Sequence, residues 1–517
     1  MVYRVLTVVI SVTIILVPIF ANNPLYLTPL IDQNKTAEAR NSSSVNSEIF
    51  INVRSYAGFL TVDERYNSNL FFWYFPNANK TLKDTPWIIW LQGGPGGSSL
   101  IGLFSEMGPF ELVDDILQLR KYSWCKDFSM VFIDNPVGAG FSFTDREEGY
   151  PRNNDMYSEN LYTAVKQLIL LFPELGEAPL YIAGESYAGR YVPNMAIKIM
   201  KGNQMHNTIN LKGLIMGNPI LDRDSIVDYI RIFYDWGLVD SQGDLAVKPI
   251  QNELYQAVKD GNNVEADELR NRVLSELEEI SYRRDSYNLL NDDVVTGVKT
   301  FVPFVTSQRV RTAIHVANQT FMFNNLKLHQ YLLADFLAPV SSKIQILLQS
   351  YKILIYCGQL DLTTPCVLNA EGRRRKWRWS GRESFFKAPR VPWWLDDKVV
   401  GYVKSGGGLT EVLVTGAGHL APADKPAELQ QLITYFINGL DLPRPPSYTP
   451  DVNIPNYEEY TDLYYSANVS QITPGLIASI VVNVLLLIGI VVGGLLVCRW
   501  KRHYDILPFD DSVLTLT

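Results

Sequence analysis

One serine in this sequence stands where a nucleophile is expected. Ser186 lies in the segment Gly-Glu-Ser-Tyr-Ala-Gly, directly after the apolar run 180–183 and before a segment with helical character. A serine at such a strand-turn-helix corner exposes its hydroxyl group when small residues flank it. The match to the pattern G-x-S-x-G is near, not strict, because Ala188 takes the place of the second glycine. The motif is weak on its own, so the prediction depends on its partners.

A nucleophilic serine needs a general base, usually a histidine, and an acid that orients the base. Among the five histidines, His419 alone lies on a glycine-rich loop after a strand-like run, residues 411–415. Asp361 follows the apolar run 353–356 through a short loop, and open α/β sheets build their sites on such loops. The order serine, aspartate, histidine along the chain is that of the α/β-hydrolases. We therefore predict a catalytic triad of Ser186, Asp361 and His419.

A second glycine-rich segment could stabilise the negative charge that forms during acyl transfer. The sequence Gln-Gly-Gly-Pro-Gly-Gly-Ser-Ser begins at Gln92, directly after the apolar run 87–91. The backbone N–H groups of Gly94 and Tyr187 are predicted to form an oxyanion hole. A phosphate-binding loop is the competing interpretation, but no Gly-Lys-Ser/Thr sequence follows. No metal ion or organic cofactor is predicted.

Hydrophobic patterns locate the elements that must position these residues. Four short apolar runs predict buried parallel strands of an α/β sheet, residues 87–91, 129–133, 180–183 and 353–356. Between about 222 and 302, apolar residues recur at helical spacing among many charges, including Leu269, Val273, Leu277 and Ile280. We expect a helical insertion over the sheet there, with the apolar stripe serving only core packing.

Length and charge limit the classes of function. The 517 residues are 47% hydrophobic and carry a formal net charge of -8, which allows a large buried core. A nucleic-acid-binding protein would need a basic stripe, and none is visible, so no nucleic-acid partner is expected. The one dense basic run, Arg373 to Lys376, is interpreted as a solvated loop, with recognition of an anionic patch as the alternative.

The N-terminal residues predict export from the cytosol. Residues 5–20 are almost wholly apolar and follow Arg4, which is typical of a signal peptide, here residues 1–21, with an uncleaved anchor as the alternative. Residues 22–47 are rich in Asn, Ser and Thr and are expected to be loose. The body is expected over residues 48–442.

The C-terminal residues predict a membrane anchor. A stalk rich in Pro, Tyr and acidic residues is expected over 443–473. Residues 476–497 contain no charge and are long enough to span a bilayer as one transmembrane helix. A basic cluster follows at once, so the positive-inside rule places the tail, residues 498–517, in the cytosol. We expect a single-pass type I membrane protein with a lumenal or extracellular body.

Three short features of the span and tail have two interpretations each. Cys498 is a candidate for palmitoylation or a plain interfacial thiol. Gly489 and Gly493 form G-x-x-x-G, which could be the seam of a homodimer or ordinary glycines of a membrane helix. The run from Tyr504 to Leu507 has the form of a tyrosine-based sorting signal, although such strings are common by chance.

Cysteines and sequons agree with a lumenal body. Three cysteines, Cys125, Cys357 and Cys366, remain outside the predicted tail and can form at most one disulfide, whose pairing stays open. Five N-x-S/T sequons are candidates for N-glycosylation, at Asn34, Asn41, Asn79, Asn318 and Asn468.

Five strings together resemble the signature blocks of the serine carboxypeptidase family, namely WLQGGPGGSS, DNPVGAGFSF, GESYAGRYVP, YCGQLD and GAGHLAPADKP. The string GGPGGSS, without its usual cysteine, is similar to the vitellogenic-carboxypeptidase-like branch. The resemblance covers roughly residues 51–439. It implies an α/β-hydrolase fold with a mostly parallel sheet, and the release of single C-terminal amino acids from peptides or proteins.

The resemblance also implies that Gln92, Glu106 and Glu185 bind the terminal carboxylate of the substrate. Two glutamates beside a carboxylate imply that one proton is shared, and hence binding in acid, as in an endosome or lysosome. The Golgi and the cell surface remain alternative locations. Gln92 replaces the usual asparagine, and Gly97 replaces a cysteine, so a disulfide common in the family cannot form. Leu420 replaces a methionine, which leaves the preference for the leaving residue open.

Two other functions remain compatible with the sequence. Plant relatives on this scaffold transfer acyl groups to alcohols, and residue identities do not exclude such an acyltransferase. The chain could also be a non-catalytic lumenal protein that binds or stabilises a partner. The complete set of triad residues argues against this last interpretation.

Overall fold

The computed structural model describes residues 23–205, 209–222, 228–291, 293–368, 370, 373 and 377–446, together with ten positions between 483 and 496. The chain divides into two units, Met1–Pro450 and Asp451–Thr517. No helix among the described positions is long and apolar enough to cross a membrane. The predicted signal peptide, Asn468 and the tail, with most of the predicted stalk and transmembrane helix, lie outside the described residues.

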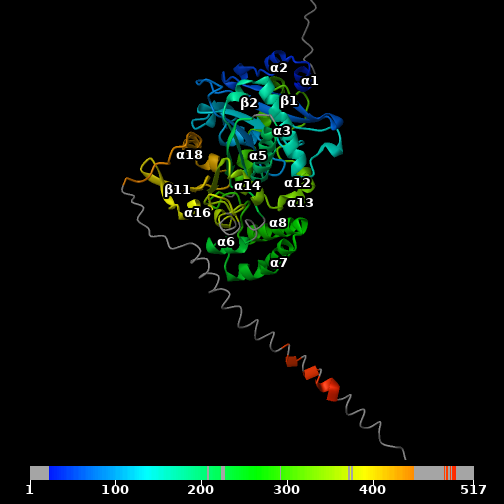
Figure 1. The fold of residues 1–517 in the computed structure, drawn as a ribbon, viewed down its shortest axis with the longest axis vertical. Helices are drawn as coiled ribbons and strands as arrows, with labels where there is room; N and C mark the ends of the chain where they lie inside the picture. Colours follow the sequence, from blue (N-terminus) through cyan, green and yellow to red (C-terminus); the bar gives the residue numbers. More distant parts are fainter. Residues whose placement is uncertain are drawn as a thin grey trace, which may run out of the picture. The chain divides into compact units, whose positions relative to one another are not determined.

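A ten-stranded mixed sheet forms the centre of the first unit (Figure 1). Its six middle strands, β6, β3, β7, β8, β9 and β12, pair in parallel, and the two strands at each edge pair antiparallel. The predicted mostly parallel α/β sheet is therefore confirmed. In spatial order the strands are β1 (Tyr56–Asp63), β2 (Ser68–Phe75), β6 (Ser129–Ile133), β3 (Trp87–Leu91), β7 (Leu180–Glu185), β8 (Leu211–Gly217), β9 (Lys352–Gly358), β12 (Leu409–Val414), β11 (Lys398–Gly406) and β10 (Val391–Leu395).

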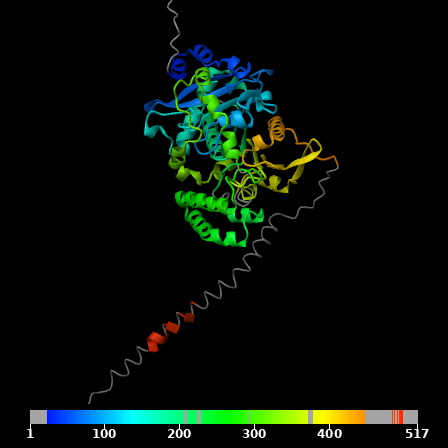
Figure 2. The same ribbon diagram turned by 180° about the vertical axis from the view of Figure 1, so that it is seen from behind.

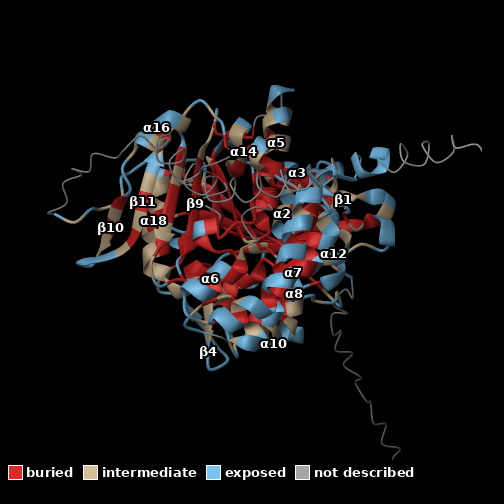
Figure 3. Cartoon of the chain, turned by 90° about the horizontal axis from the view of Figure 1, so that it is seen from below, coloured by how far each residue is buried: buried red, intermediate tan, exposed pale blue. Residues whose placement is uncertain are grey.

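Both faces of the sheet are buried, which is why its central strands appear in the sequence as unbroken apolar runs. On β3, Trp87, Ile89 and Leu91 pack into one core with the helices α3 (Asn154–Leu171) and α5 (Ala188–Gln204). Ile88 and Trp90 point to the other face, into a second core that includes α18 (Pro426–Asn438). Figure 3 shows the buried strands between more exposed helices.

A long helical segment connects β8 to β9, as predicted, but it extends beyond the expected range 222–302. The predicted stripe lies on α8 (Asn263–Ile280), where Leu269, Val273 and Leu277 are buried. α8 packs against α7 (Ser241–Asp260), and the two form the green pair at the lower end of the first unit in Figures 1 and 2. The segment also contains α6 (Tyr229–Asp235), α9 (Val294–Val298), α10 (Val302–Thr306), α11 (Gln308–Ala313), α12 (Leu326–Tyr331), α13 (Leu333–Phe336) and α14 (Ser341–Leu347).

The N-terminal segment is ordered against the body, so the prediction of a loose segment over 22–47 is wrong for residues 23–47. It forms α1 (Thr28–Asp32) and α2 (Thr36–Ser42). Leu27 and Ala39 are fully buried in the main core, and Arg40 makes two hydrogen bonds to Glu174 at 2.8 and 2.9 Å. The segment is mostly polar, so its composition did not predict that a few apolar residues pack it against the body.

Candidate active site

Ser186 lies on the sharp turn between β7 and α5, with a left-handed φ of 58°. Such a backbone is costly for a side chain other than glycine and is typical of a nucleophile elbow. A Cβ on Gly184 would lie 2.5 Å from Leu91 O and 2.6 Å from the Cβ of Ala188. The turn therefore requires glycine at Gly184, whereas the small Cβ of Ala188 fits, which explains the inexact motif.

The glycine-rich loop after β3 passes directly over this turn. A Cβ on Gly93 would lie 2.6 Å from the Cβ of Ser186 and 2.9 Å from the backbone nitrogen of Tyr187. Gly94 has a φ of 116°, which L side chains rarely adopt. The loop therefore brings the backbone at Gly93 next to the N–H of Tyr187, and Gly94, the other residue predicted for the oxyanion hole, follows Gly93 in the chain and lines the same pocket as Ser186.

The side chain of Tyr187 fixes the nucleophile turn through a buried hydrogen bond. Its hydroxyl donates to Asp335 Oδ2 over 2.9 Å, and the guanidinium of Arg190 pairs with the same oxygen over 3.3 Å. Tyr187, Arg190 and Asp335 are all buried. Asp335 belongs to α13, so the helical segment fixes one end of the nucleophile turn. Sequence analysis did not identify this contact, because Asp335 carries no local motif.

His419 and Asp361 form a buried pair, with 2.7 Å between His419 Nδ1 and Asp361 Oδ2. The carboxylate of Asp361 also accepts hydrogen bonds from Asn218 Nδ2 at 2.5 Å and from Thr364 Oγ1 at 2.6 Å. Burial raises the pKa of Asp361, but His419 and Thr364 together outweigh it, so the pKa lies below its usual value. An ionised Asp361 favours the imidazole tautomer with its proton on Nδ1, which leaves Nε2 to accept.

The loop that carries His419 is fixed on two sides. Its backbone N–H donates to Tyr287 O over 2.7 Å, and the Tyr287 ring lies 4.7 Å from the imidazole, centroid to centroid. Asp424 Oδ2 accepts from Gly418 N at 2.7 Å and from Asn288 Nδ2 at 2.9 Å. Tyr287 and Asn288 come from the helical segment, so that segment positions the histidine as well.

Three residues beside the triad form a buried polar chain. Trp90 Nε1 donates to Gln92 Oε1 over 2.9 Å, and Gln92 Nε2 donates to Glu185 Oε1 over 2.6 Å. Glu106, at the end of the π-helical turn Gly102–Glu106, faces Glu185 closely enough to share a hydrogen bond once either carboxyl is protonated. Apart from this contact, both Glu106 oxygens and Glu185 Oε2 have no hydrogen-bond partner in the part of the chain that the structure describes.

Burial sets the charge of this glutamate pair. Desolvation raises the pKa of both Glu106 and Glu185, and the charge of Glu106 raises that of Glu185 further. Both side chains are fully buried. Two neighbouring buried carboxylates repel each other, so the pair retains a shared proton above the pH at which an ordinary glutamate loses its own.

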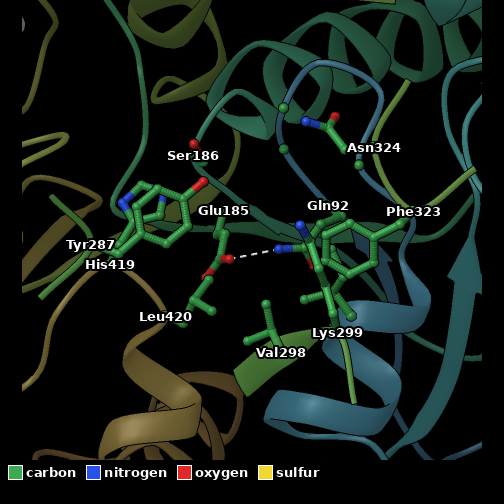
Figure 4. A pocket seen from close by; sticks show the side chains of 14 residues that line it. Gln92, Glu185, Ser186, Tyr287, Val298, Lys299, Phe323, Asn324, His419 and Leu420 are labelled. Atoms are coloured by element: carbon green, nitrogen blue, oxygen red, sulfur yellow. Dashed lines mark hydrogen bonds between the residues drawn. The ribbon is translucent and has the colours of Figure 1, made fainter. Parts of the chain in front are cut away.

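One pocket brings the predicted residues together (Figure 4). Gln92, Gly94, Glu185, Ser186 and His419 all line it. Asp361 and Glu106 do not line it, and each contacts a residue that does, Asp361 through His419 and Glu106 through Glu185. The rest of the lining was not predicted from the residue pattern, and Leu420 was named only through the family resemblance. Besides Gly93 and Gly97, it consists of Ile101, Tyr287, Val298, Lys299, Phe323, Asn324 and Leu420.

The structure also answers the open question of the cysteines. Cys357 pairs with Cys366, and Cys125 is a free thiol. The disulfide closes the loop on which Asp361 lies. Four sequon asparagines lie among the described residues and all are exposed, namely Asn34, Asn41, Asn79 and Asn318. No group of three or more His, Cys, Asp or Glu residues in the described part of the chain could hold a metal ion.

Comparison with known proteins identifies the family. The family model described as serine carboxypeptidase matches residues 45–439. The chain is 39% identical to the venom serine carboxypeptidase of Apis mellifera, over 81% of this chain and 92% of that protein. It is 36% identical to the vitellogenic carboxypeptidase of Aedes aegypti, over 80% and 90%. It is 37% identical to a probable serine carboxypeptidase of Homo sapiens, over 81% and 90%. These relatives confirm the resemblance to the vitellogenic-carboxypeptidase-like branch.

A solved structure confirms the fold. A prohormone-processing carboxypeptidase from Saccharomyces cerevisiae superposes with a TM-score of 0.68 at 23% sequence identity, covering 77% of this chain and 96% of that one. The family model spans the sheet, the helical segment and the residues of the pocket. The chain belongs to the serine carboxypeptidase family, and its activity is that of a serine carboxypeptidase.

Proposed function

We propose that this carboxypeptidase cleaves the last peptide bond of its substrates through an acyl-enzyme on Ser186. The observation that carries the proposal is the 2.7 Å contact between His419 Nδ1 and Asp361, with His419 and Ser186 lining one pocket. Asp361 holds the imidazole so that Nε2 takes the serine proton as Oγ attacks the carbonyl carbon. No hydrogen bond joins Ser186 Oγ and His419 Nε2 among the described residues, so the mechanism requires the serine hydroxyl to rotate toward Nε2 before the proton is transferred.

The charge that develops on the carbonyl oxygen meets the backbone N–H groups of Gly94 and Tyr187. The close approach of the Gly93 backbone to Tyr187 N supports this assignment. The C–N bond breaks, and His419 returns its proton to the departing amino group. Water then attacks the acyl-enzyme with His419 as base, and Ser186 regains its proton as the shortened peptide leaves.

The terminal carboxylate of the substrate binds at Gln92, Glu185 and Glu106. The hydrogen-bonded chain from Trp90 to Glu185 and the raised pKa values of the two glutamates support this assignment. A shared proton supplies a donor to the substrate carboxylate, which two ionised glutamates would repel. The enzyme therefore acts best in a mildly acidic compartment.

The proposal is tested with Ser186→Ala in the purified full-length protein. The variant should lose several orders of magnitude in kcat on peptides with a free C-terminus, because triad members act as a unit. Its thermal unfolding should match that of the wild type, since Ser186 Oγ contributes no hydrogen bond to the described fold. Turnover close to that of the wild type would exclude the mechanism.

We further propose that the body is lumenal or extracellular, glycosylated and held by one transmembrane helix. The apolar segments at both ends of the sequence and the exposure of Asn34, Asn41, Asn79 and Asn318 support this topology. Removal of N-glycans should increase electrophoretic mobility, and protease added to sealed vesicles should trim only the C-terminal tail. Protection of the tail would contradict the topology.

A further inference from the structure

The substrate pocket contains a cation that the mechanism does not use. Lys299 directly follows α9 and lines the pocket beside Val298 and Phe323 (Figure 4). Its Nζ lies 5.5 Å from the centroid of the Phe323 ring, a cation–π contact that keeps the ammonium group near the pocket wall. Asp293, an acidic neighbour along the chain, pairs instead with Arg284 over 3.7 Å. Among the described residues, no ion pair neutralises Lys299.

The position of the substrate decides which of its groups meets Lys299, given the carboxylate and cleavage sites proposed above. The Cα of the terminal residue carries three groups, the scissile nitrogen, the carboxylate and the side chain. The nitrogen lies near Ser186 and the carboxylate near Gln92 and Glu185. The side chain must therefore point to another part of the lining. Tyr287 packs on His419 and Asn324 lies against Gly94, so the wall that is left for this side chain consists of Ile101, Val298, Lys299, Phe323 and Leu420.

This wall is apolar except for one positive charge. Val298 and Leu420 are buried aliphatic residues, whereas Lys299 is exposed at the side of the pocket. A side chain with an aliphatic stem and an anionic end would pack its stem on Val298 and Leu420 and place its charge beside Lys299. A cationic end would meet repulsion there and would lose hydration without gaining a partner.

We propose that Lys299 makes the enzyme select a C-terminal residue with an acidic side chain, glutamate before its neutral isostere glutamine. A glutamate side chain has an ordinary pKa of ~4.3 and is still largely ionised in mild acid, so the contact persists where the enzyme is most active. Because Lys299 is solvent-exposed, the preference for glutamate over glutamine should be roughly twofold to fivefold, within the range that an exposed ion pair of ~0.2–1 kcal/mol gives.

The test compares kcat/KM for three N-blocked dipeptides that differ only in the last residue, glutamate, glutamine or lysine. In the wild type the order should be glutamate, glutamine, lysine. In Lys299→Met the ratio of glutamate to glutamine should fall to about one, and in Lys299→Glu the order of glutamate and lysine should reverse. Ratios within one variant are independent of any general change in activity.

Two controls separate charge from other effects. Lys248→Met removes an exposed lysine of α7 that does not line the pocket, and it should keep the wild-type ratio. Raising the salt from ~0.1 M to ~1 M shortens the screening length from about 10 Å to about 3 Å and should weaken the preference. A ratio near one in the wild type, or a ratio unchanged in both Lys299 variants, would overturn the proposal.

The same assay separates this inference from the proposed function. If glutamate is not preferred while amidated dipeptides remain poor substrates, only the role of Lys299 is wrong. If free and amidated dipeptides react equally, the carboxylate site itself is wrong, and the geometric argument for Lys299 fails with it.

Discussion

Trp90 Nε1 donates a hydrogen bond to Gln92 Oε1 over 2.9 Å, and this contact orients the amide group of Gln92. An indole N–H can only donate, so the oxygen of the amide must face Trp90 and its NH₂ group must face Glu185. Gln92 therefore enters the pocket as a donor. A donor is what a substrate carboxylate requires, so this orientation supports the carboxylate-binding role proposed for Gln92.

Trp90→Phe should weaken binding of peptides with a free C-terminus. The variant removes the donor that orients Gln92, so KM should rise about fivefold, the size of one hydrogen bond of ~1 kcal/mol, with little change in kcat. Trp124→Phe is the matched control, because Trp124 packs edge-to-face on Trp90 at 5.7 Å. Equal KM values for Trp90→Phe and the wild type would remove the proposed role of the amide.

Substrate affinity should fall as the pH rises from mild acid to neutrality. Burial raises the pKa of Glu106 and of Glu185, so their shared proton is present in acid and is lost as the pH rises through the titration of the pair. The donor to the substrate carboxylate then disappears, and KM should climb. In the double variant Glu106→Gln/Glu185→Gln, whose amides do not titrate, the climb should be flattened.

Glu106 and Glu185 should also make the folding stability fall as the pH rises. A group whose pKa is raised in the folded state stabilises that state at a pH below its unfolded pKa, and this contribution is lost as the pH rises through the folded pKa. The Tm of the wild type should therefore fall more between mild acid and neutrality than that of the double variant. A KM that is constant over this range, or equal slopes in both proteins, would contradict the shared proton.

Asp361→Asn should reduce kcat by a factor on the order of 10⁴ and leave the fold intact. The carboxylate of Asp361 accepts from Asn218, Thr363 N, Thr364 N and Thr364 Oγ1 as well as from His419. In the variant the amide oxygen can stay at the Oδ1 position, where it accepts from Thr363 N and Thr364 N. The NH₂ group then takes the Oδ2 position, where it faces His419 Nδ1 and imposes the wrong tautomer.

Asp424→Asn is the matched control, because Asp424 fixes the His419 loop through Gly418 N and does not touch the imidazole. Its effect on kcat should be far smaller than that of Asp361→Asn. Pre-steady-state measurement of acyl-enzyme formation with an ester substrate reports the step directly. Comparable losses in the two variants would assign the effect to the loop and not to the tautomer.

Removing the disulfide should impair catalysis through Asp361. Cys357 and Cys366 are separated by 9 positions, and Asp361 lies between them on the closed loop. The double variant Cys357→Ala/Cys366→Ala should lose about 2 kcal/mol of folding stability and about tenfold in kcat, since the loop that holds the carboxylate gains freedom in both states. Cys125→Ala, which removes the free thiol, is the control, and equal kcat in both variants would show that the loop holds Asp361 without the bond.

Short sequence patterns were sufficient to predict those parts of the protein whose conformation depends on neighbouring residues in the chain. The central strands appear as unbroken apolar runs because both faces of a parallel sheet are buried. The Gly184, Ser186 and Ala188 turn is recognisable because a tight backbone excludes larger side chains from consecutive positions. The glycine-rich loop at Gly93 is recognisable for the same steric reason. The order of the triad residues along the chain can be read directly from the sequence. The resemblance to the family, not the residue pattern, supplied Gln92, Glu106 and Glu185.

Only the tertiary structure decided which distant residues complete the site. Asn218, Asp335 and Tyr287 carry no motif. Strand order and the helical segment bring Asn218 to Asp361, Tyr287 to His419, and Asp335 to Tyr187, the neighbour of Ser186. The partner of Cys357, the docking of residues 23–47 and the position of Lys299 in the pocket depend on the same long-range packing. A short stretch of sequence indicates which backbone conformation its residues can adopt. Burial, a shared proton and the wall of a pocket depend on segments that are distant in the sequence and come together only when the chain folds.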